Sequence, residues 1–286
     1  MTTRPCIELY TRGEDIRLYN MDCVEGAKQY VASGSVDLLI ADPPFAIDEQ
    51  RLVRFYTKYP DRVIPGYVFA PDDYYRFSIA WMVQAYRVLK QHGSMYVVTG
   101  WSQGHIIQTA LVKLGFVIIN ELVYSYDFPI VAKHKFNSAH CRIYYCKKHK
   151  HAKPTFRKHC RFEITDKDEN GKSLHYRDMS SVWYFKQESR NGKYKHLTKL
   201  PDELVRKILA YSSYENDLVA DFFLGSGTTA IQAHRMKRRV IGFEKNSKAF
   251  QHLIAQLEEN RSEVVPHDST TGIRVCNACF ADPYLS

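Results

Sequence analysis

The sequence has no long hydrophobic run, and this absence limits what the chain can be. None of its apolar stretches reaches the roughly 18 residues that suggest a transmembrane helix. The first residues, Met1 to Cys6, carry no apolar core of the kind found in a secretory signal. The seven cysteines are an odd number in a chain too long to need disulfides. We therefore expect an intracellular, cytoplasmic protein in a reducing compartment, with free thiols and no membrane partner.

The sequence also lacks a recognisable metal-binding pattern. Cys276 and Cys279 have the spacing of half a zinc knuckle, but no second pair follows them. The histidines and cysteines between residues 140 and 160 match no standard ligand spacing. We therefore expect no metal.

Internal repeats and low-complexity tracts are absent as well, and the composition is that of a globular protein. Of the 286 residues, 45% are hydrophobic and 25% are charged. The charge is unevenly distributed: residues 133–199 contain 18 Lys and Arg against six Asp and Glu. This segment has a net charge of +12 in a chain of +9, so the remainder carries −3. The basic segment favours a polyanionic partner.

Apolar runs alternate with amphipathic segments along most of the chain. Strands are predicted at 16–23, 36–41, 95–99, 116–124, 143–146, 217–223 and 239–244. Helices are predicted at 24–32, 72–91, 103–114, 201–211, 227–236 and 247–260. This alternation predicts an α/β fold, a doubly wound parallel sheet with helices on both faces. Asp37 and Asp48 are interpreted as surface or strand-edge groups.

The first motif with chemical content is Asp42-Pro43-Pro44-Phe45, which follows the apolar run Val36–Ala41. The two prolines end the strand and stiffen the turn, because neither can donate a ladder hydrogen bond. At the carboxyl end of a parallel strand, where ligands bind, the Asp42 carboxylate and a proline carbonyl could accept hydrogen bonds from an amino group. Phe45 could stack on the ring that carries that group. These four residues alone fit a plain Pro-Pro turn equally well.

The second motif runs from Asp221 through Phe222, Phe223, Gly225 and Gly227 off a predicted strand into a helix. Glu244 ends the following strand, where its carboxylate could accept from two ribose hydroxyls. No lysine follows Gly227, which excludes a phosphate-binding P-loop. A carboxylate at Asp221 would repel a pyrophosphate but could hold an α-ammonium group. This charge argument favours S-adenosyl-L-methionine over a dinucleotide.

Together the two motifs resemble the β class of DNA amino-methyltransferases, in which an Asp-Pro-Pro-aromatic motif precedes a Phe-x-Gly-x-Gly motif. Further segments match in order over about residues 7–260: Tyr19–Cys23, Asn137–His140, Ile143–Lys148, Ser181–Trp183 and His196–Pro201. In the last segment, Leu197, Lys199 and Leu200 depart from the family pattern. The resemblance implies a Rossmann-like methyltransferase sheet with circularly permuted motif order.

The resemblance also implies the site residues. The catalytic residues would be Asp42, Pro43, Pro44 and Phe45. The residues that bind S-adenosyl-L-methionine would be Asp22, Cys23, Asp42, His196, Thr198, Asp221, Phe222, Phe223, Gly225, Gly227, Thr228, Glu244 and Asn246. The residues that contact DNA would be Lys147, Lys148, Lys150, Arg157, Lys158 and Arg161.

The expected domain organisation follows from the same comparison. Residues 1–146 would be the catalytic half, 147–195 a basic target-recognition insert, 196–260 the cofactor-binding half and 261–286 a tail. The partner would be double-stranded DNA, and a homodimer and a cognate restriction enzyme are further partners that the family suggests.

The expected reaction is methyl transfer to the N6 amino group of an adenine flipped out of duplex DNA. Adenine members of the family usually carry Asp at the position of Asp42 and cytosine-N4 members usually carry Ser. Cytosine-N4 methylation stays open as an alternative, as do an RNA or glutamine target and an inactive nucleic-acid-binding protein of the same fold. A dinucleotide-dependent oxidoreductase would leave the Asp42–Phe45 motif unexplained.

Overall fold

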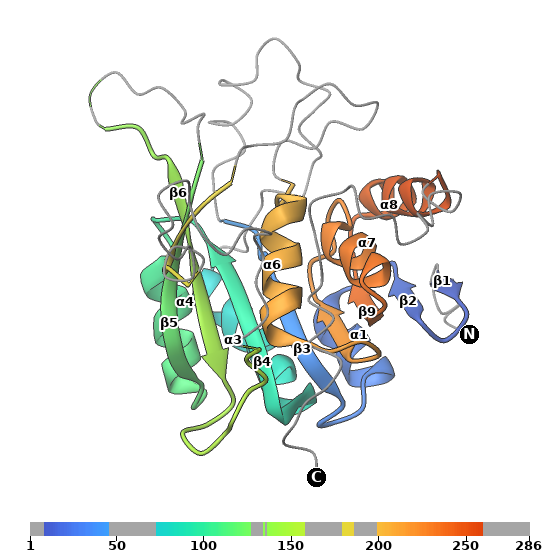
Figure 1. Ribbon diagram of the computed structural model, residues 1–286, viewed down its shortest axis with the longest axis horizontal. Helices are drawn as coiled ribbons and strands as arrows, with labels where there is room; N and C mark the ends of the chain where they lie inside the picture. Colours follow the sequence, from blue (N-terminus) through green and yellow to red (C-terminus); the bar gives the residue numbers. More distant parts are fainter. Residues whose placement is uncertain are drawn as a thin grey trace, which may run out of the picture.

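The chain folds around one twisted sheet (Figure 1). The computed structural model describes residues 9–45, 73–126, 134, 136–157, 179–185 and 199–259. Within these ranges the strands are β1 (Leu9–Arg12), β2 (Ile16–Tyr19), β3 (Val36–Ala41), β4 (Leu89–Thr99), β5 (Val117–Ser125), β6 (His140–Lys147), β7 (Val182–Tyr184), β8 (Leu218–Asp221) and β9 (Arg239–Phe243). Their order across the sheet is β1-β2-β9-β8-β3-β4-β6-β5-β7.

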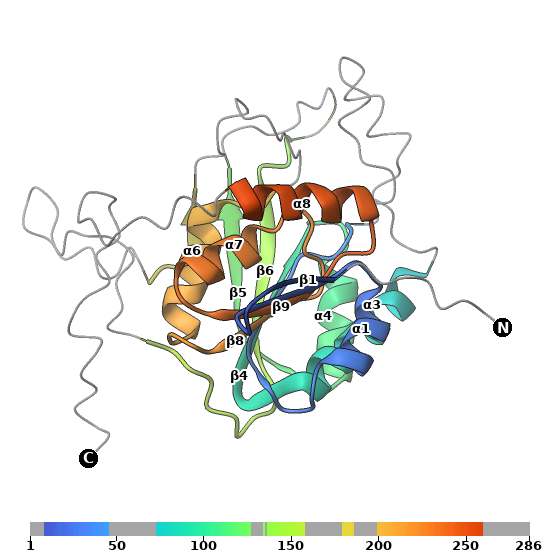
Figure 2. The same ribbon diagram turned by 90° about the vertical axis from the view of Figure 1, so that its right-hand side faces the viewer.

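Helices cover both faces of this sheet (Figure 2). They are α1 (Cys23–Tyr30), α3 (Tyr74–Val88), α4 (Gly104–Lys113), α6 (Asp202–Ser212), α7 (Thr228–Arg235) and α8 (Ser247–Glu259). Helices α1, α3 and α4 pack on one face, and α6, α7 and α8 pack on the other, so each face has its own hydrophobic core. This confirms the predicted Rossmann-like α/β class. Among the described residues, no helix is both long and apolar enough to cross a membrane.

The sheet is mixed, which corrects the prediction of a parallel sheet. Strands β2, β9, β8, β3 and β4 run parallel as expected. Strand β6 is antiparallel to both of its neighbours, β4 and β5. Among the described residues between β5 and β6, which are 126, 134 and 136–139, no helix occurs, and antiparallel neighbours can pair without a helical crossover.

The boundary between α3 and β4 also differs from the prediction. Asp73 caps α3, with its side chain accepting from the Arg76 N–H at 2.9 Å, and the helix ends at Val88 rather than near residue 91. Gly93, which comes just after the predicted helix and would be a usual residue to end one, lies inside β4. A Cβ at Gly93 would lie 2.9 Å from the Val36 carbonyl oxygen, so glycine lets β4 approach β3 closely.

Asp37 is buried within β3, although the sequence analysis interpreted it as a surface or edge group. Its carboxylate accepts a hydrogen bond from the Lys90 ammonium at 2.6 Å and another from the Leu218 N–H at 3.0 Å. Asp37 therefore joins three neighbouring strands, β3, β4 and β8, where β4 and β8 begin. Asp48 lies outside the described residues.

The described parts of the predicted insert, 147–195, either join the main sheet or follow directly from it. Residues 147–157 continue from β6 along the sheet edge, and β7 pairs parallel with β5. Residues 158–178 and 186–195 lie outside the described ranges, so a separate target-recognition unit and the other domain boundaries stay predictions.

Candidate active site

Two carboxylates meet at the ends of adjacent strands. Asp42 directly follows β3, and Asp221 is the last residue of β8, which pairs parallel with β3 so that Asp221 lies opposite Ile40. From this pair the chain continues to β4 on one side and to β9 on the other. Such a reversal of strand order opens a crevice at the carboxyl ends of the strands, where α/β sheets bind ligands.

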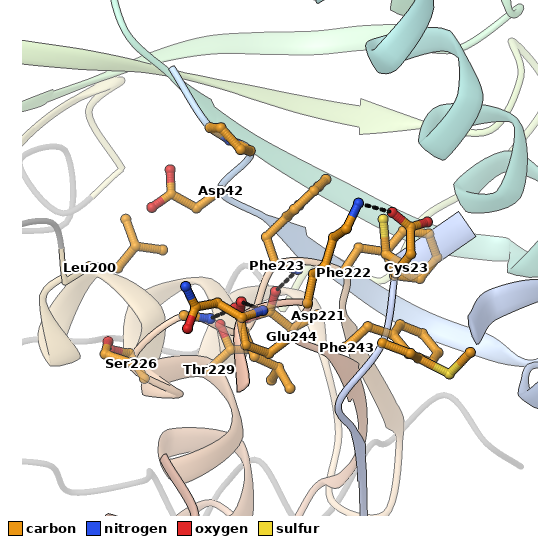
Figure 3. A pocket seen from close by; sticks show the side chains of 18 of the residues that line it. Cys23, Asp42, Leu200, Asp221, Phe222, Phe223, Ser226, Thr229, Phe243 and Glu244 are labelled. Carbon is orange, nitrogen blue, oxygen red and sulfur yellow. Dashed lines mark hydrogen bonds and ion pairs between the residues drawn. The ribbon is translucent and has the colours of Figure 1, made fainter. Parts of the chain in front are cut away.

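A cavity of about 610 Å³ lies at this edge (Figure 3). Its size is within the usual range for small-molecule sites. Of the predicted residues it is lined by Asp22, Cys23, Asp42, Pro44, Asp221, Phe222, Phe223, Gly225, Thr228, Glu244 and Asn246. Both motifs thus contribute to one site. His196 and Thr198 lie outside the described residues and stay predictions.

The lining contains further residues that sequence reasoning missed: Met21, Phe77, Leu200, Leu224, Ser226, Thr229, Phe243 and Lys245. Lys245 could have been found, because it directly follows a strand-end acid. Phe77 could not, because it comes from the buried side of α3, where an aromatic residue reads as core.

Asp42 is the most perturbed acid of the site. Its Oδ1 is buried and accepts no hydrogen bond within the described part of the chain. Burial raises the pKa of Asp42 to about 8, and the nearby Asp221 carboxylate adds to the shift. A buried acceptor without a donor favours a ligand that brings an N–H group.

Asp221 is buried but better satisfied. Its Oδ1 accepts from the Phe223 N–H at 2.8 Å. Burial raises the pKa of Asp221 to about 6, while hydrogen bonds from the Phe223 N–H and the Thr229 side chain oppose the shift. Asp221 therefore ionises before Asp42, and its negative charge is available to a cationic ligand.

Glu244 fixes two turns at the floor of the cavity. Its Oε2 accepts from the Gly225 N–H at 2.9 Å and its Oε1 from the Asn246 N–H at 2.7 Å. Burial raises the pKa of Glu244, and these two N–H groups counteract that rise. A carboxylate has about four acceptor positions, so Glu244 can still accept from a ligand hydroxyl.

Gly227 supports the site from behind rather than lining it. It precedes α7 with φ of 78°, in the left-handed region. A Cβ there would lie 1.9 Å from Leu253 Cδ1 of α8. The glycine therefore allows both the turn and the close packing of α8, and its predicted contact with the cofactor stays a prediction.

Asp22 and Cys23 form the side of the cavity next to β2. The Asp22 side chain caps α1 by accepting from the Val24 N–H at 2.9 Å, and its other oxygen lies 3.5 Å from the Lys245 ammonium. Cys23 is a buried free thiol whose pKa burial raises. Both side chains lie where the sequence placed them, beside the cofactor motif.

Pro43 and Phe45 do not line the cavity. Pro43 is buried, and the Phe45 ring packs near Gly100, where an added Cβ would lie 3.5 Å from it. Phe45 also contacts the hydrophobic core on the α6 side of the sheet. The stacking role predicted for Phe45 stays a prediction.

The predicted DNA contacts that are described lie at the opposite edge of the sheet. Strand β6 runs from Arg142, which pairs with Thr99 at the carboxyl end of β4, to Lys147, which pairs with Ser94 nearer its start. Lys148, Lys150 and Arg157 follow Lys147, so they leave β6 at the end of the sheet away from Asp42, which directly follows β3. The course of β6 across the sheet can be followed in Figure 1. The sequence could not predict this placement, because hydrophobic pattern does not encode strand direction, and the DNA contacts themselves stay predictions. Lys158 and Arg161 lie outside the described residues.

The described residues contain no group of three His, Cys, Asp or Glu that could hold a metal ion. The site instead combines four carboxylates, Asp22, Asp42, Asp221 and Glu244, with aromatic walls. Such a lining suits a ligand that carries positive charge, hydroxyl groups and a flat ring.

Comparison with known proteins gives a consistent result. The model of the DNA methylase family N6_N4_Mtase matches residues 36–256. The type II methyltransferase M.HinfI of Haemophilus influenzae is 29% identical over 245 residues, which cover 79% of this chain and 64% of that protein. The type II methyltransferase M1.MboII of Moraxella bovis is 27% identical over 81% of this chain and 92% of its own length. The chain thus spans less than two thirds of M.HinfI.

Solved structures share the fold. The M1.HpyAVI–SAM complex aligns with a TM-score of 0.60 at 23% identity, covering 85% of this chain and 98% of its own. The cytosine-N4-specific PvuII DNA methyltransferase aligns with a TM-score of 0.61 at 17% identity, covering 84% of this chain and 86% of its own.

Proposed function

Because the chain belongs to the N6/N4 family of DNA methylases, we propose that it transfers a methyl group from S-adenosyl-L-methionine to the N6 amino group of adenine in DNA. One observation carries the proposal. The Asp42 carboxyl has a buried oxygen without a hydrogen-bond donor among the described residues, at the rim of the cavity that the cofactor motif forms. An exocyclic amino group is the donor that this position suits.

The residues of the cavity fit the proposed cofactor. Asp221 offers a negative charge to an ammonium group, Glu244 keeps free acceptor positions for ribose hydroxyls, and Phe222 and Phe243 supply apolar walls. When bound, S-adenosyl-L-methionine supplies an electrophilic methyl group on a sulfonium sulfur. Lys245 is the cavity's one cationic lining residue among those described, and Asp22 lies beside it.

The chain's own contribution to the reaction centres on Asp42. An exocyclic amine is a poor nucleophile because its lone pair is conjugated into the ring. A hydrogen bond from the NH2 group to Asp42 Oδ1 would draw the nitrogen toward tetrahedral geometry and localise that lone pair. As the nitrogen gains the methyl group it must lose a proton, and the raised pKa of Asp42 suits this carboxylate to accept it.

The choice of adenine rests on the side chain at position 42. Adenine members of the family usually carry Asp there, and cytosine-N4 members usually carry Ser. Cytosine-N4 methylation is the second candidate, because the same geometry would hold either amino group. The intact acids Asp42 and Asp221 argue against an inactive DNA-binding protein. The homodimer and the cognate restriction enzyme remain predictions.

Product identification tests the proposed function. The protein is incubated with methyl-labelled cofactor and duplex DNA, the DNA is digested, and the labelled nucleoside is identified by chromatography. We expect N6-methyldeoxyadenosine. N4-methyldeoxycytidine would select the second candidate, and label that appears only in a parallel RNA reaction would overturn DNA as the substrate.

The pKa of Asp42 predicts a pH dependence of transfer. If the ionised carboxylate accepts from the amine, kcat/KM should rise about tenfold per pH unit below pH 8 and level off above it. The Asp42→Asn variant should lose this titration, because an amide does not ionise. Initial rates between pH 6 and 9 measure both. A wild-type profile that falls above pH 8 would show that the protonated acid is the working form, and a profile that is flat from pH 6.5 to 8.5 would contradict the prediction.

A further inference from the structure

The side of the sheet where the parallel strands begin lies opposite the cavity and is strongly cationic. The proposed reaction does not use this side. We call this surface the basic edge and define it as Asp37, Lys90, His92, residues 147–157, Glu215, Asp217, Lys237, Arg238 and Arg239. It contains nine Lys and Arg against three carboxylates, Asp37, Glu215 and Asp217. The lining of the cavity has the reverse balance, with four carboxylates and one lysine.

The three carboxylates of the basic edge are already engaged. Asp37 is buried against Lys90, and Asp217 accepts a hydrogen bond from the Tyr214 N–H at 2.7 Å. Glu215 lies 3.7 Å from the Lys237 ammonium. These acids therefore interact with groups close to the sheet, and they do not offset the positive charges of the exposed lysines of residues 147–157.

Residues 147–157, which we call the basic strap, are held in place by hydrogen bonds to two elements, β4 and α6. The Lys148 ammonium donates to the Leu89 carbonyl at 2.8 Å, and the Thr155 N–H donates to the His92 carbonyl at 3.0 Å. The Arg157 N–H donates to the Tyr211 carbonyl of α6 at 2.8 Å. The strap thus presents its charges from a fixed backbone, which lowers the entropic cost of binding.

The strap also connects to the other cations of the edge. The Arg157 and Arg238 guanidinium groups both donate to the Ser213 carbonyl, at 3.4 Å and 2.8 Å. Arg157 also lies 4.9 Å from the centre of the Tyr214 ring. The surface is therefore continuous from the end of β6 to the start of β9.

Four side chains of the strap are exposed, those of Lys150, His151, Lys153 and Phe156. In the described ranges, no carboxylate pairs with Lys150 or Lys153. Unpaired lysines on a rigid strap can replace the counterions that condense on a phosphate backbone.

We propose that the basic edge is a second nucleic-acid contact surface, which binds the phosphate backbone of duplex DNA without sequence preference. It is separate from the surface around Asp42, because β6 crosses the sheet between the two edges. Only the choice of DNA as the polyanion rests on the proposed function. The basic edge therefore adds non-specific affinity, and base recognition stays with other parts of the chain.

The test compares two double variants with equal charge change. In K150Q/K153Q two lysines of the strap are neutralised. In K28Q/K113Q two exposed lysines on α1 and α4 are neutralised outside the basic edge. Binding of a fluorescent 16-base-pair duplex is measured by anisotropy from about 0.05 to 0.3 M salt, without S-adenosyl-L-methionine. The outcome is therefore independent of methyl transfer.

We expect K150Q/K153Q to bind more weakly with a shallower salt dependence. Losing two phosphate contacts should make the slope of log K against log salt less negative by about 2, and affinity at 0.1 M salt should fall roughly 10- to 60-fold. The control should stay near wild type. Equal behaviour of the two double variants would overturn the proposal, and tighter binding of a single-stranded RNA of equal length would overturn the assignment to duplex DNA.

A second measurement locates the contact. Lysine acetylation is followed by mass spectrometry with and without the duplex. Lys150 and Lys153 should be protected by DNA at least several-fold, and Lys113 should not. Unchanged acetylation of Lys150 and Lys153 in bound protein would overturn the proposal even if affinity had changed.

Discussion

The Asp42→Ala variant should transfer methyl groups about 10³-fold more slowly than wild type, with S-adenosyl-L-methionine affinity changed by less than about tenfold. The carboxylate is the proposed acceptor of the amino group, and a positioned acid or base of this kind contributes roughly 10² to 10⁴ in rate. The cofactor keeps Asp221, Glu244 and the aromatic walls, so its binding should largely survive. Single-turnover transfer and calorimetry measure the two quantities.

Asp42→Asn is the matched variant of the same shape. It separates loss of charge from loss of packing, and it should be nearly as slow as Asp42→Ala. Equal rates for wild type and both variants would remove Asp42 from the mechanism.

The Asp42→Asn substitution should also make the protein more stable than wild type at alkaline pH. The pKa of Asp42 is raised from 3.8 to about 8 on folding, so between these values the folded chain binds a proton that the unfolded chain has released. Stability contributed by this group therefore falls as pH rises through that window. Thermal unfolding should show Asp42→Asn above wild type at pH 8, with a smaller gap at pH 4.5.

Gly227→Ala should lower the free energy of unfolding by about 2 to 4 kcal/mol and weaken cofactor binding. The residue has φ of 78°, and its new Cβ would lie 1.9 Å from Leu253 Cδ1 in the core. The backbone penalty and the clash act together, and relief of either moves the turn that carries Gly225 and Ser226. Urea unfolding and calorimetry measure the two effects.

Gly34 offers a control for this prediction. It has φ of 63°, but a Cβ there would meet nothing within 4 Å. Gly34→Ala should therefore show the backbone penalty of about 1 to 2 kcal/mol alone. If Gly227→Ala costs no more than Gly34→Ala, the packing against Leu253 is not restrictive. Partial rescue by Leu253→Ala in the double variant would confirm the clash.

The sequence located the two chemical motifs because both follow apolar strands directly. Asp42 and Asp221 could be assigned to the same sheet edge, since the carboxyl ends of parallel strands point one way. The effect of Asp221 on the pKa of Asp42 could not be predicted, because it depends on β3 and β8 being neighbours although about 180 residues of chain separate the two acids.

Other features depended on distant partners and were missed. Asp37 reads as a surface acid until Lys90 and the Leu218 N–H are placed beside it. From the sequence alone, Gly93 resembles a residue that ends a helix. What requires glycine there is the carbonyl oxygen of Val36 on the neighbouring strand, a contact that the sequence does not show. The number of basic residues after β6 is visible in the sequence, but the direction of β6 is not, so the sequence could not predict on which side of the sheet they lie.

The reversed direction of β6 has a consequence for how the protein would search a genome. Its eight residues carry the chain roughly 27 Å, from the side of Asp42 to the side of Lys147. A straight duplex held at one edge would leave the other edge open to a different DNA segment. A chain that grips two segments can pass from one to the next without dissociating, so intersegment transfer should shorten its search as the local DNA concentration rises.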